Sequence, residues 1–104
     1  MTDTRRAQEC AALLQALAEP SRIRIIDCLR TGAKHVSQLA ELLGAEIVNV
    51  SHHLGVLRNA RMVQSEKQGR FVIYTLAPEY FGLDAAAGDT LVALGWCTVR
   101  IPQG

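Results

Sequence analysis

Histidine and cysteine offer this chain its most versatile chemistry, and the spacing of its histidines argues against a metal site. His52 and His53 are adjacent, and successive helix positions point about 100° apart, so the pair cannot chelate one ion. No histidine follows residue 53, whereas a divalent metal needs three or four converging ligands. A Ser/His/Asp or Cys/His set, a phosphate-binding glycine loop and a paired-carboxylate motif are also missing. We therefore predict that the chain is not an enzyme.

The three cysteines, Cys10, Cys28 and Cys97, are widely spaced and form no C-x-x-C motif. This pattern is neither a disulfide framework nor a zinc knuckle. Cys28 shares a helix face with Ile25 and Leu29, which favours a buried structural thiol. Two roles stay open: inert packing, or a thiol switch in which Cys97 pairs with Cys10 or Cys28. A third thiolate would turn that pair into a soft-metal site, so a soft metal ion is the one cofactor considered.

Positive charge is concentrated in the middle of the chain. The 104 residues include 11 Lys and Arg against 10 Asp and Glu, for a formal charge of +1. Residues 22–70 hold eight basic against four acidic side chains, a net charge of +4, whereas residues 1–21 carry −1 and residues 71–104 carry −2. A chain that is nearly neutral as a whole therefore has one basic segment, as a nucleic-acid-binding surface requires.

Length and composition predict one globular domain. A chain of this size buries a single modest core, and 49% hydrophobic residues are typical of a folded protein. No run approaches the ~18 apolar residues of a membrane span, and the polar start lacks the apolar stretch of a signal peptide. We therefore expect a cytoplasmic protein that does not enter a membrane.

Two helices are predicted in the first third of the chain. Residues 5–18 are rich in helix formers and repeat apolar side chains at three- and four-residue spacing. Pro20 suits the first turn of a second helix, because its missing N–H is not needed there. We expect Gly32 to end that helix in a left-handed conformation.

Two shorter helices follow and are separated by a tight turn. The third is expected to begin at Ser37 as N-cap and to end at Gly44. The fourth covers roughly residues 46–60. Short helices joined by a glycine-containing turn are typical of a helix-turn-helix. The inward face of the fourth helix is predicted to consist of Val50, Leu54 and Leu57.

Beyond the fourth helix the apolar period changes to alternation. Residues 63–67 and 70–76 predict two strands around a turn at 68–69, and so a β-hairpin. Residues 82–88 are expected to form a flexible or weakly helical connector, and residues 91–101 a strand. A hairpin directly after a helix-turn-helix indicates a winged helix, whose second paired helix enters the major groove while the hairpin tip reaches the adjacent backbone. The predicted class is mainly α with a small β-hairpin and a C-terminal strand.

Three segments resemble the ArsR/SmtB family of bacterial winged-helix repressors. Residues 17–25 (LAEPSRIRI) resemble its "LadptRlrIL" opening, residues 50–58 (VSHHLGVLR) its "vSqHLkvLr" recognition helix, and residues 68–76 (QGRFVIYTL) its "GRwvyYrL" wing. The resemblance spans residues 13–77, with the motifs in the same order. It implies a homodimeric repressor that releases its double-stranded operator on sensing a metal ion, a thiol oxidant or a similar stress signal.

The sequence departs from the family pattern at both common sensor sites. The metal motif "ELCVCDL" corresponds to residues 33–39 (AKHVSQL), which lack both cysteines. The D-x-H…H-x-x-[EH] set of the family's C-terminal helix has no histidine here. Metal sensing at either position is therefore not expected. The resemblance also places Cys10 and Cys97 in segments that meet at the family's dimer interface, so we divide the chain into a DNA-binding domain, 1–81, and a dimerisation and sensor tail, 82–104.

Two further departures concern the helix-turn-helix itself. Residues 46–49 (EIVN) replace a polar stretch and leave the recognition helix without a good N-cap, which costs about 1 kcal/mol. Arg61 stands where the family has glycine, and a left-handed residue there would carry roughly 1 kcal/mol of strain. We therefore expect this turn to differ from the family's.

The predicted DNA contacts lie on the recognition helix and the wing. Val48 is expected to touch a thymine methyl group, His53 to bond to backbone or phosphate, and Arg22 and Arg24 are weaker phosphate candidates. Two alternatives stay open: a protein-interaction module without DNA binding, which the apolar pair 47–48 favours, and a constitutive DNA binder without a sensor. The full predicted set is Val48, Asn49, Ser51, His52, His53, Arg58, Lys67 and Arg70.

Overall fold

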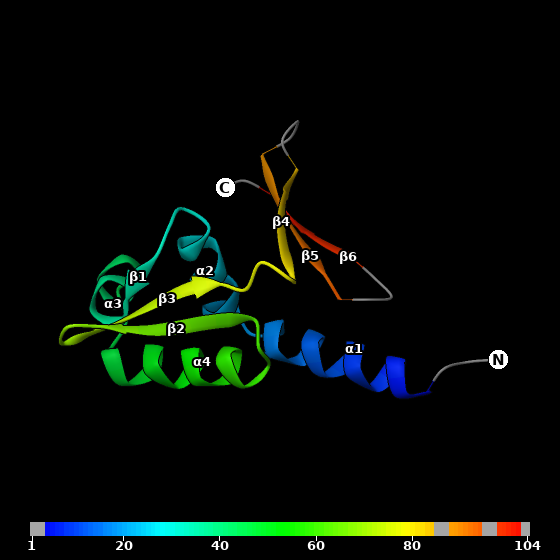
Figure 1. The fold of residues 1–104 in the computed structure, drawn as a ribbon, viewed down its shortest axis with the longest axis horizontal. Coiled ribbons are helices and arrows are strands. Elements are labelled where there is room, and N and C mark those ends of the chain that lie inside the picture. The colour runs from blue at the N-terminus through cyan, green and yellow to red at the C-terminus, as the bar shows by residue number, and fades with distance from the viewer. Residues whose placement is uncertain (1–3, 85–87, 95–97, 103–104) are drawn as a thin grey trace.

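A computed structural model describes residues 4–84, 88–94 and 98–102, which form a winged helix-turn-helix followed by a small second sheet (Figure 1). α1 (Thr4–Leu17) and α2 (Pro20–Leu29) lie where the helix formers and Pro20 predicted them. The C-cap residue of α2 is Arg30, whose backbone lies in the right-handed helical region, and Gly32, with φ +134°, lies two residues beyond this cap. The predicted glycine stop is therefore wrong, because the glycine shapes the following turn instead. None of the helices in these ranges has the length and apolar character needed to cross a membrane.

The N-cap residue of α3 (Val36–Leu43) is His35 and not the predicted Ser37. The Gln38 backbone N–H donates to His35 Nδ1 at 3.4 Å, and the His35 N–H donates to Gln38 Oε1 at 3.0 Å. This is a capping box in which an imidazole replaces the usual hydroxyl. Gly44, with φ +62°, ends the helix in the left-handed region as predicted.

α4 (Ile47–Asn59) is the second helix of the helix-turn-helix. Glu46 at its N-cap makes no side-chain capping bond, as the sequence predicted. The predicted inward face is confirmed, since each of its three residues is at most 1% exposed. The buried residues Val50, Leu54 and Leu57 pack α4 against the core, so the opposite face of the helix is exposed to solvent.

The turn after α4 keeps the left-handed conformation in spite of its arginine. Arg61 has φ +63°, and its N–H donates to Arg58 O at 2.9 Å. The Met62 N–H donates to Leu57 O at 2.9 Å, which completes a Schellman motif, and the Met62 and Leu57 side chains are both fully buried. The expectation of a different turn is wrong, because the buried contact holds Arg61 in a strained conformation.

The wing is a three-stranded antiparallel sheet of order β1-β3-β2. β2 (Val63–Gln68) and β3 (Phe71–Leu76) pair from Val63↔Leu76 to Gln68↔Phe71 around a two-residue turn at 69–70. Gly69 has φ +63°, as the first position of a type II′ hairpin turn requires. β1 (Lys34–His35) was not predicted, because two residues are too short to show a period.

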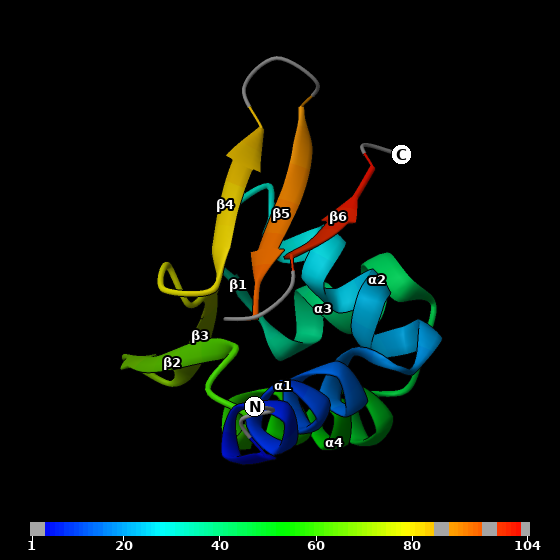
Figure 2. The ribbon, with the colours of Figure 1, turned by 90° about the vertical axis from the view of Figure 1, so that its right-hand side faces the viewer.

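The C-terminal segment forms a second antiparallel sheet of order β4-β5-β6, which stands over α2 (Figure 2). Its strands are β4 (Phe81–Asp84), β5 (Asp89–Ala93) and β6 (Thr98–Ile101). The prediction of β structure in residues 91–101 is confirmed, but this segment contributes to two strands, β5 and β6, instead of one. The predicted connector is wrong for residues 82–84, which belong to β4, while residues 85–87 lie outside the described ranges. Val92 and Leu94 are buried and join the main core.

Candidate nucleic-acid interface

The solvent face of α4 carries most of the predicted DNA contacts. The side chains of Asn49, Ser51 and His52 are exposed along its first half, and Arg58 is exposed near its end. Val48 is 68% exposed, which is unusual for a valine and leaves its methyl groups open to a partner. The structure thus brings five predicted residues to one helix that is fixed from behind by the core.

The wing adds two cations to this end of the molecule. Lys67 lies in β2 next to the turn and Arg70 in the turn itself, and both are exposed. Among the described residues, no carboxylate pairs with Lys67, Arg70 or Arg58. The wing turn and the first turn of α4 lie at the same, left-hand end of the molecule in Figure 1. The positive charges of Lys67, Arg70 and Arg58 therefore remain available to phosphate groups.

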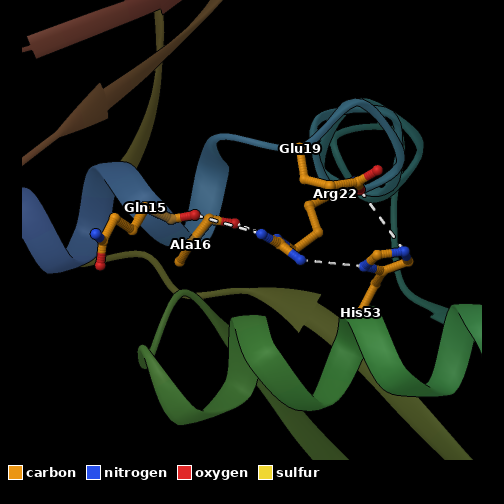
Figure 3. Close-up of polar contacts among 5 residues, drawn as sticks. All are labelled: Gln15, Ala16, Glu19, Arg22 and His53. Carbon is orange, nitrogen blue, oxygen red and sulfur yellow. Dashed lines mark hydrogen bonds and ion pairs between the residues drawn. The ribbon is translucent and has the colours of Figure 1, made fainter.

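His53 occupies a different position from its neighbour His52. Its side chain is only 17% exposed and lies between the α1–α2 junction and α4 (Figure 3). Arg22 Nη1 lies 3.2 Å from His53 Nδ1, and Glu19 Oε2 lies 3.6 Å from His53 Nε2. The expected bond to backbone or phosphate is thus replaced by two side-chain partners.

Arg22 also binds the end of α1. Its Nε donates to Ala16 O at 2.6 Å and its Nη2 to Gln15 O at 3.3 Å. Both carbonyls lie in the last turn of α1, where the usual i+4 intrahelical donors are missing, although Gln15 O also accepts from the Ala18 N–H at 3.2 Å. Glu19 accepts from the Arg22 N–H at 3.1 Å and so caps α2. Three side chains therefore join the end of α1, the start of α2 and the middle of α4.

This network determines which nitrogen of His53 carries the proton. A guanidinium has only donors, so His53 Nδ1 accepts from Arg22. The proton of the neutral ring then lies on Nε2, which faces Glu19. Because Arg22 is held by α1 and His53, its role as a phosphate contact is not supported, whereas Arg24 is exposed on α2.

His35 links α3 to the wing in addition to capping α3. Its ring stacks on Phe71 at a centroid distance of 4.8 Å and an interplanar angle of 21°. Because Phe71 follows the wing turn directly, this contact holds the tip end of the wing against the start of α3. His35 lies within residues 33–39, which correspond to the family's metal motif, and the sequence alone indicated no capping role for it. The useful signal was Gln38 three residues later, as a capping box requires.

The cysteines show no thiol switch within the described residues. Cys10 is 8% exposed in α1, and Cys28 is half-buried in α2. Burial, followed by the nearby charge of Asp27, raises the pKa of the Cys28 thiol, although Lys34 and Arg24 act in the opposite direction. A raised pKa makes this thiol a poor nucleophile at neutral pH. Cys97, the partner in both predicted pairs, lies outside the described ranges.

Metal ligands do not gather in the part of the chain that the structure describes. No three His, Cys, Asp or Glu side chains there lie close enough to hold an ion. The rings of His52 and His53 meet edge to face at 5.4 Å, in line with their divergence on the helix. The histidines found here act as a helix cap, a link between helices and an exposed polar group.

Comparisons with known proteins point to one family. The model of the bacterial regulatory proteins of the arsR family matches residues 19–65. The transcriptional regulator NmtR of Mycobacterium tuberculosis is 46% identical over 74 residues, which are 71% of this chain and 62% of NmtR. The regulator CmtR of Mycobacterium bovis is 40% identical over 80 residues, which are 77% of this chain and 68% of CmtR. The chain therefore spans less than two thirds of the length of NmtR.

A solved structure supports the same assignment. It is the homodimeric winged helix-turn-helix DNA-binding domain of a possible ArsR-family regulator from Mycobacterium bovis. It superposes with a TM-score of 0.68 at 27% identity, over 76% of this chain and 75% of that one.

Proposed function

The chain belongs to the ArsR family of bacterial regulatory proteins, and we propose that it is a homodimeric repressor that an effector releases from its operator. As a member of that family it is a DNA-binding transcriptional regulator and not an enzyme. The observation that carries the proposal is the outward face of α4, which is polar, exposed and fixed by three buried aliphatic residues. We propose that this face enters the major groove of double-stranded DNA.

Base reading is assigned to the first half of α4. Amide, hydroxyl and imidazole groups of Asn49, Ser51 and His52 suit the donor and acceptor patterns of base edges in the major groove. Val48 suits a thymine methyl group, and its high exposure supports that contact. We assign His53 a positioning role: it holds α4 in place through its contact with Arg22 and does not touch DNA itself.

Phosphate contacts are assigned to Arg58, Lys67 and Arg70. They are exposed cations at the end of α4 and on the wing, without a carboxylate partner in the described ranges. Each phosphate neutralised by such a group makes affinity more dependent on salt. The low net charge of the chain predicts weak non-specific binding, so base contacts and dimer symmetry carry much of the selectivity.

Dimerisation is assigned to α1 together with the C-terminal tail, residues 82–104, which follows the DNA-binding domain at 1–81. Leu14 of α1 is 40% exposed, which supports a partner on this helix. The similar Mycobacterium bovis domain is a homodimer. A two-fold dimer would place its recognition helices about 34 Å apart, or a multiple of that distance, on a pseudo-palindromic operator.

The effector is proposed to be a thiol oxidant or a soft metal that acts through Cys97 with Cys10 or Cys28. The raised pKa of Cys28 argues against Cys28 as the attacking thiol. The competing proposal is a constitutive DNA binder. If Cys97→Ser leaves operator release by every oxidant and soft metal unchanged, the switch is excluded.

Fluorescence anisotropy with DNA from upstream of the protein's own gene tests the main proposal. We expect affinity to fall as salt rises, and Arg70→Ala to reduce the slope of log affinity against log salt by about 1. His52→Ala should weaken binding at constant salt slope. Arg5→Ala serves as a charge control, because Arg5 lies outside α4 and the wing and pairs with Glu9. Sedimentation of this variant must show the same oligomeric state as the wild type.

A protein-interaction module is the second candidate, because the adjacent apolar residues Ile47 and Val48 at the start of α4 are 51% and 68% exposed. Absence of salt-dependent binding to any promoter DNA would favour it and would contradict the repressor proposal.

A further inference from the structure

The tip end of the wing, residues 64–72, extends away from the core. Every residue in this range is exposed. β1 pairs with β3 only at Ile73 and Tyr74, so between Ile73 and the turn β3 pairs with β2 alone among the described strands. A two-stranded hairpin without a covered face is marginally stable in water. A contact from outside the hairpin is therefore needed to keep this end at one place.

The ring of His35 supplies such a contact. His35 is the register partner of Ile73 in the antiparallel pair, so its side chain lies on the same sheet face as those of Ile73 and Phe71. His35 and Phe71 are diagonal neighbours on that face, and their rings stack at a centroid distance of 4.8 Å. The stack thus extends the link to α3 beyond the backbone pairing of β1, as far as the residue next to Arg70.

The capping box of α3 fixes the orientation of this ring. His35 Nδ1 accepts from the Gln38 N–H at 3.4 Å, and Gln38 Oε1 accepts from the His35 N–H at 3.0 Å. The edge of the imidazole is thus held by α3 while its face meets Phe71. Leu39 of α3 and Leu54 of α4 belong to the same buried core. The wing turn is therefore connected, through His35 and α3, to the helix that carries the proposed base contacts.

We propose that His35 is a positioning residue for operator binding. It holds the wing turn at a fixed place relative to α4, so that Lys67 and Arg70 meet phosphate groups while α4 lies in the major groove. This inference rests on the proposed DNA-binding function of the wing, and His35 itself touches no DNA. Without the stack, binding must also bring the wing into place, and affinity falls with the fraction of molecules in which it already is.

Two substitutions of His35 separate its ring from its cap. His35→Asn keeps an N-cap acceptor and removes the ring. We expect its affinity for DNA from upstream of the protein's own gene to fall about 2- to 10-fold, the range of an aromatic pair. His35→Phe keeps a stacking ring and removes the cap acceptor, and it should retain most of the affinity. Fluorescence anisotropy measures affinity, and urea denaturation gives the folded fraction by which each value is corrected.

Replacing the wing cations tests whether the effect passes through the wing. In a protein with Lys67→Ala and Arg70→Ala, His35→Asn should cost no further affinity, because the wing no longer contacts phosphate. A general disturbance of the helices would persist in that background. Val72→Ala is the matched control for the wing, since Val72 is exposed in the same strand and lies on the opposite face from Phe71. It should leave the wild-type affinity unchanged.

The free protein provides a readout that needs no DNA. ¹⁵N relaxation at the Gly69 and Arg70 amides should show lower order parameters in His35→Asn than in the wild type, and wild-type values in His35→Phe. Rigid wing amides in His35→Asn would show that the stack does not hold the turn.

Three binding results separate the inference from the proposed function. Unchanged affinity of His35→Asn would overturn the inference and leave the function intact, as would a loss that persists at full size without the two wing cations. Weaker binding by His35→Phe than by His35→Asn would assign His35 to the cap alone. Absence of salt-dependent binding by the wild type would overturn the proposed function, and this inference with it.

Discussion

Arg22 Nη1 lies 3.2 Å from His53 Nδ1 and so ties the first turn of α2 to the middle of α4 (Figure 3). The same guanidinium binds two carbonyls at the end of α1. One side chain thus fixes the helix that carries the proposed base contacts relative to the two helices before it.

Arg22→Ala should lower the free energy of unfolding by about 2 kcal/mol, because charged hydrogen bonds to partly buried acceptors are lost. Urea denaturation measures the effect. Arg24→Ala is the control: Arg24 is an exposed arginine on the same helix, and its loss should change stability by less than about 0.5 kcal/mol. Equal effects of the two substitutions would refute the structural role of Arg22.

His52 and His53 should separate into a binding and a structural residue. His52→Ala is expected to weaken operator binding by about 1–3 kcal/mol, the value of a good base contact, with stability unchanged. His53→Ala should instead lower stability by about 1 kcal/mol, because it removes the partner of Arg22. Anisotropy and urea denaturation on both variants check this. The reverse pattern would show that the assignment of roles is wrong.

Arg61→Gly should stabilise the protein. An L-residue in the left-handed region is strained by about 1–2 kcal/mol. Glycine removes this strain, but its greater entropy in the unfolded chain lowers stability by about 0.5–1 kcal/mol. We therefore expect a net gain of roughly 0.5–1 kcal/mol in urea denaturation. Arg61→Ala keeps the strain and should show no such gain. A loss of stability in Arg61→Gly would mean that the arginine side chain makes a contact worth more than the strain.

Cys28 should react slowly and make stability fall at alkaline pH. With Cys10→Ser and Cys97→Ser in place, the single thiol should react with a disulfide reagent more slowly in the folded protein than in urea, because its folded pKa is raised. The unfolded thiol loses its proton at lower pH than the folded one. The contribution of the protonated Cys28 thiol to the free energy of unfolding is therefore complete below the pKa of the unfolded thiol. It is lost as pH rises through the pKa of the folded thiol.

The matched variant for this pH effect is Cys28→Ala in the same background. Its free energy of unfolding should lack that alkaline decline relative to the single-thiol protein. Equal reaction rates in the folded and unfolded protein would contradict the burial of the thiol.

The local signals of the sequence were sufficient for the helix-turn-helix and the wing. The apolar spacing of Val50, Leu54 and Leu57 predicts the buried face of α4, and the alternation after Met62 predicts the hairpin. These patterns work because backbone hydrogen bonding and side-chain direction repeat over a few residues. Exposure of Asn49 and His52 follows from the same spacing.

Other features depend on contacts between distant segments. Nothing local distinguishes His53 from His52, because the partners of His53 lie 31 and 34 positions earlier in the chain. β4 escaped prediction because Gly82 and its neighbours show strand character only when paired with β5.

The sequence by itself therefore determined the fold class, the family and the face of α4 that meets solvent, since each depends on short-range periodicity and order. Only the tertiary structure decided that Arg22 and His53 act together, that Arg61 adopts a left-handed turn and that the buried Thr90 hydroxyl has no hydrogen-bond partner among the described residues. Each of these depends on which side chains packing brings within a few ångströms, and sequence spacing does not encode that distance.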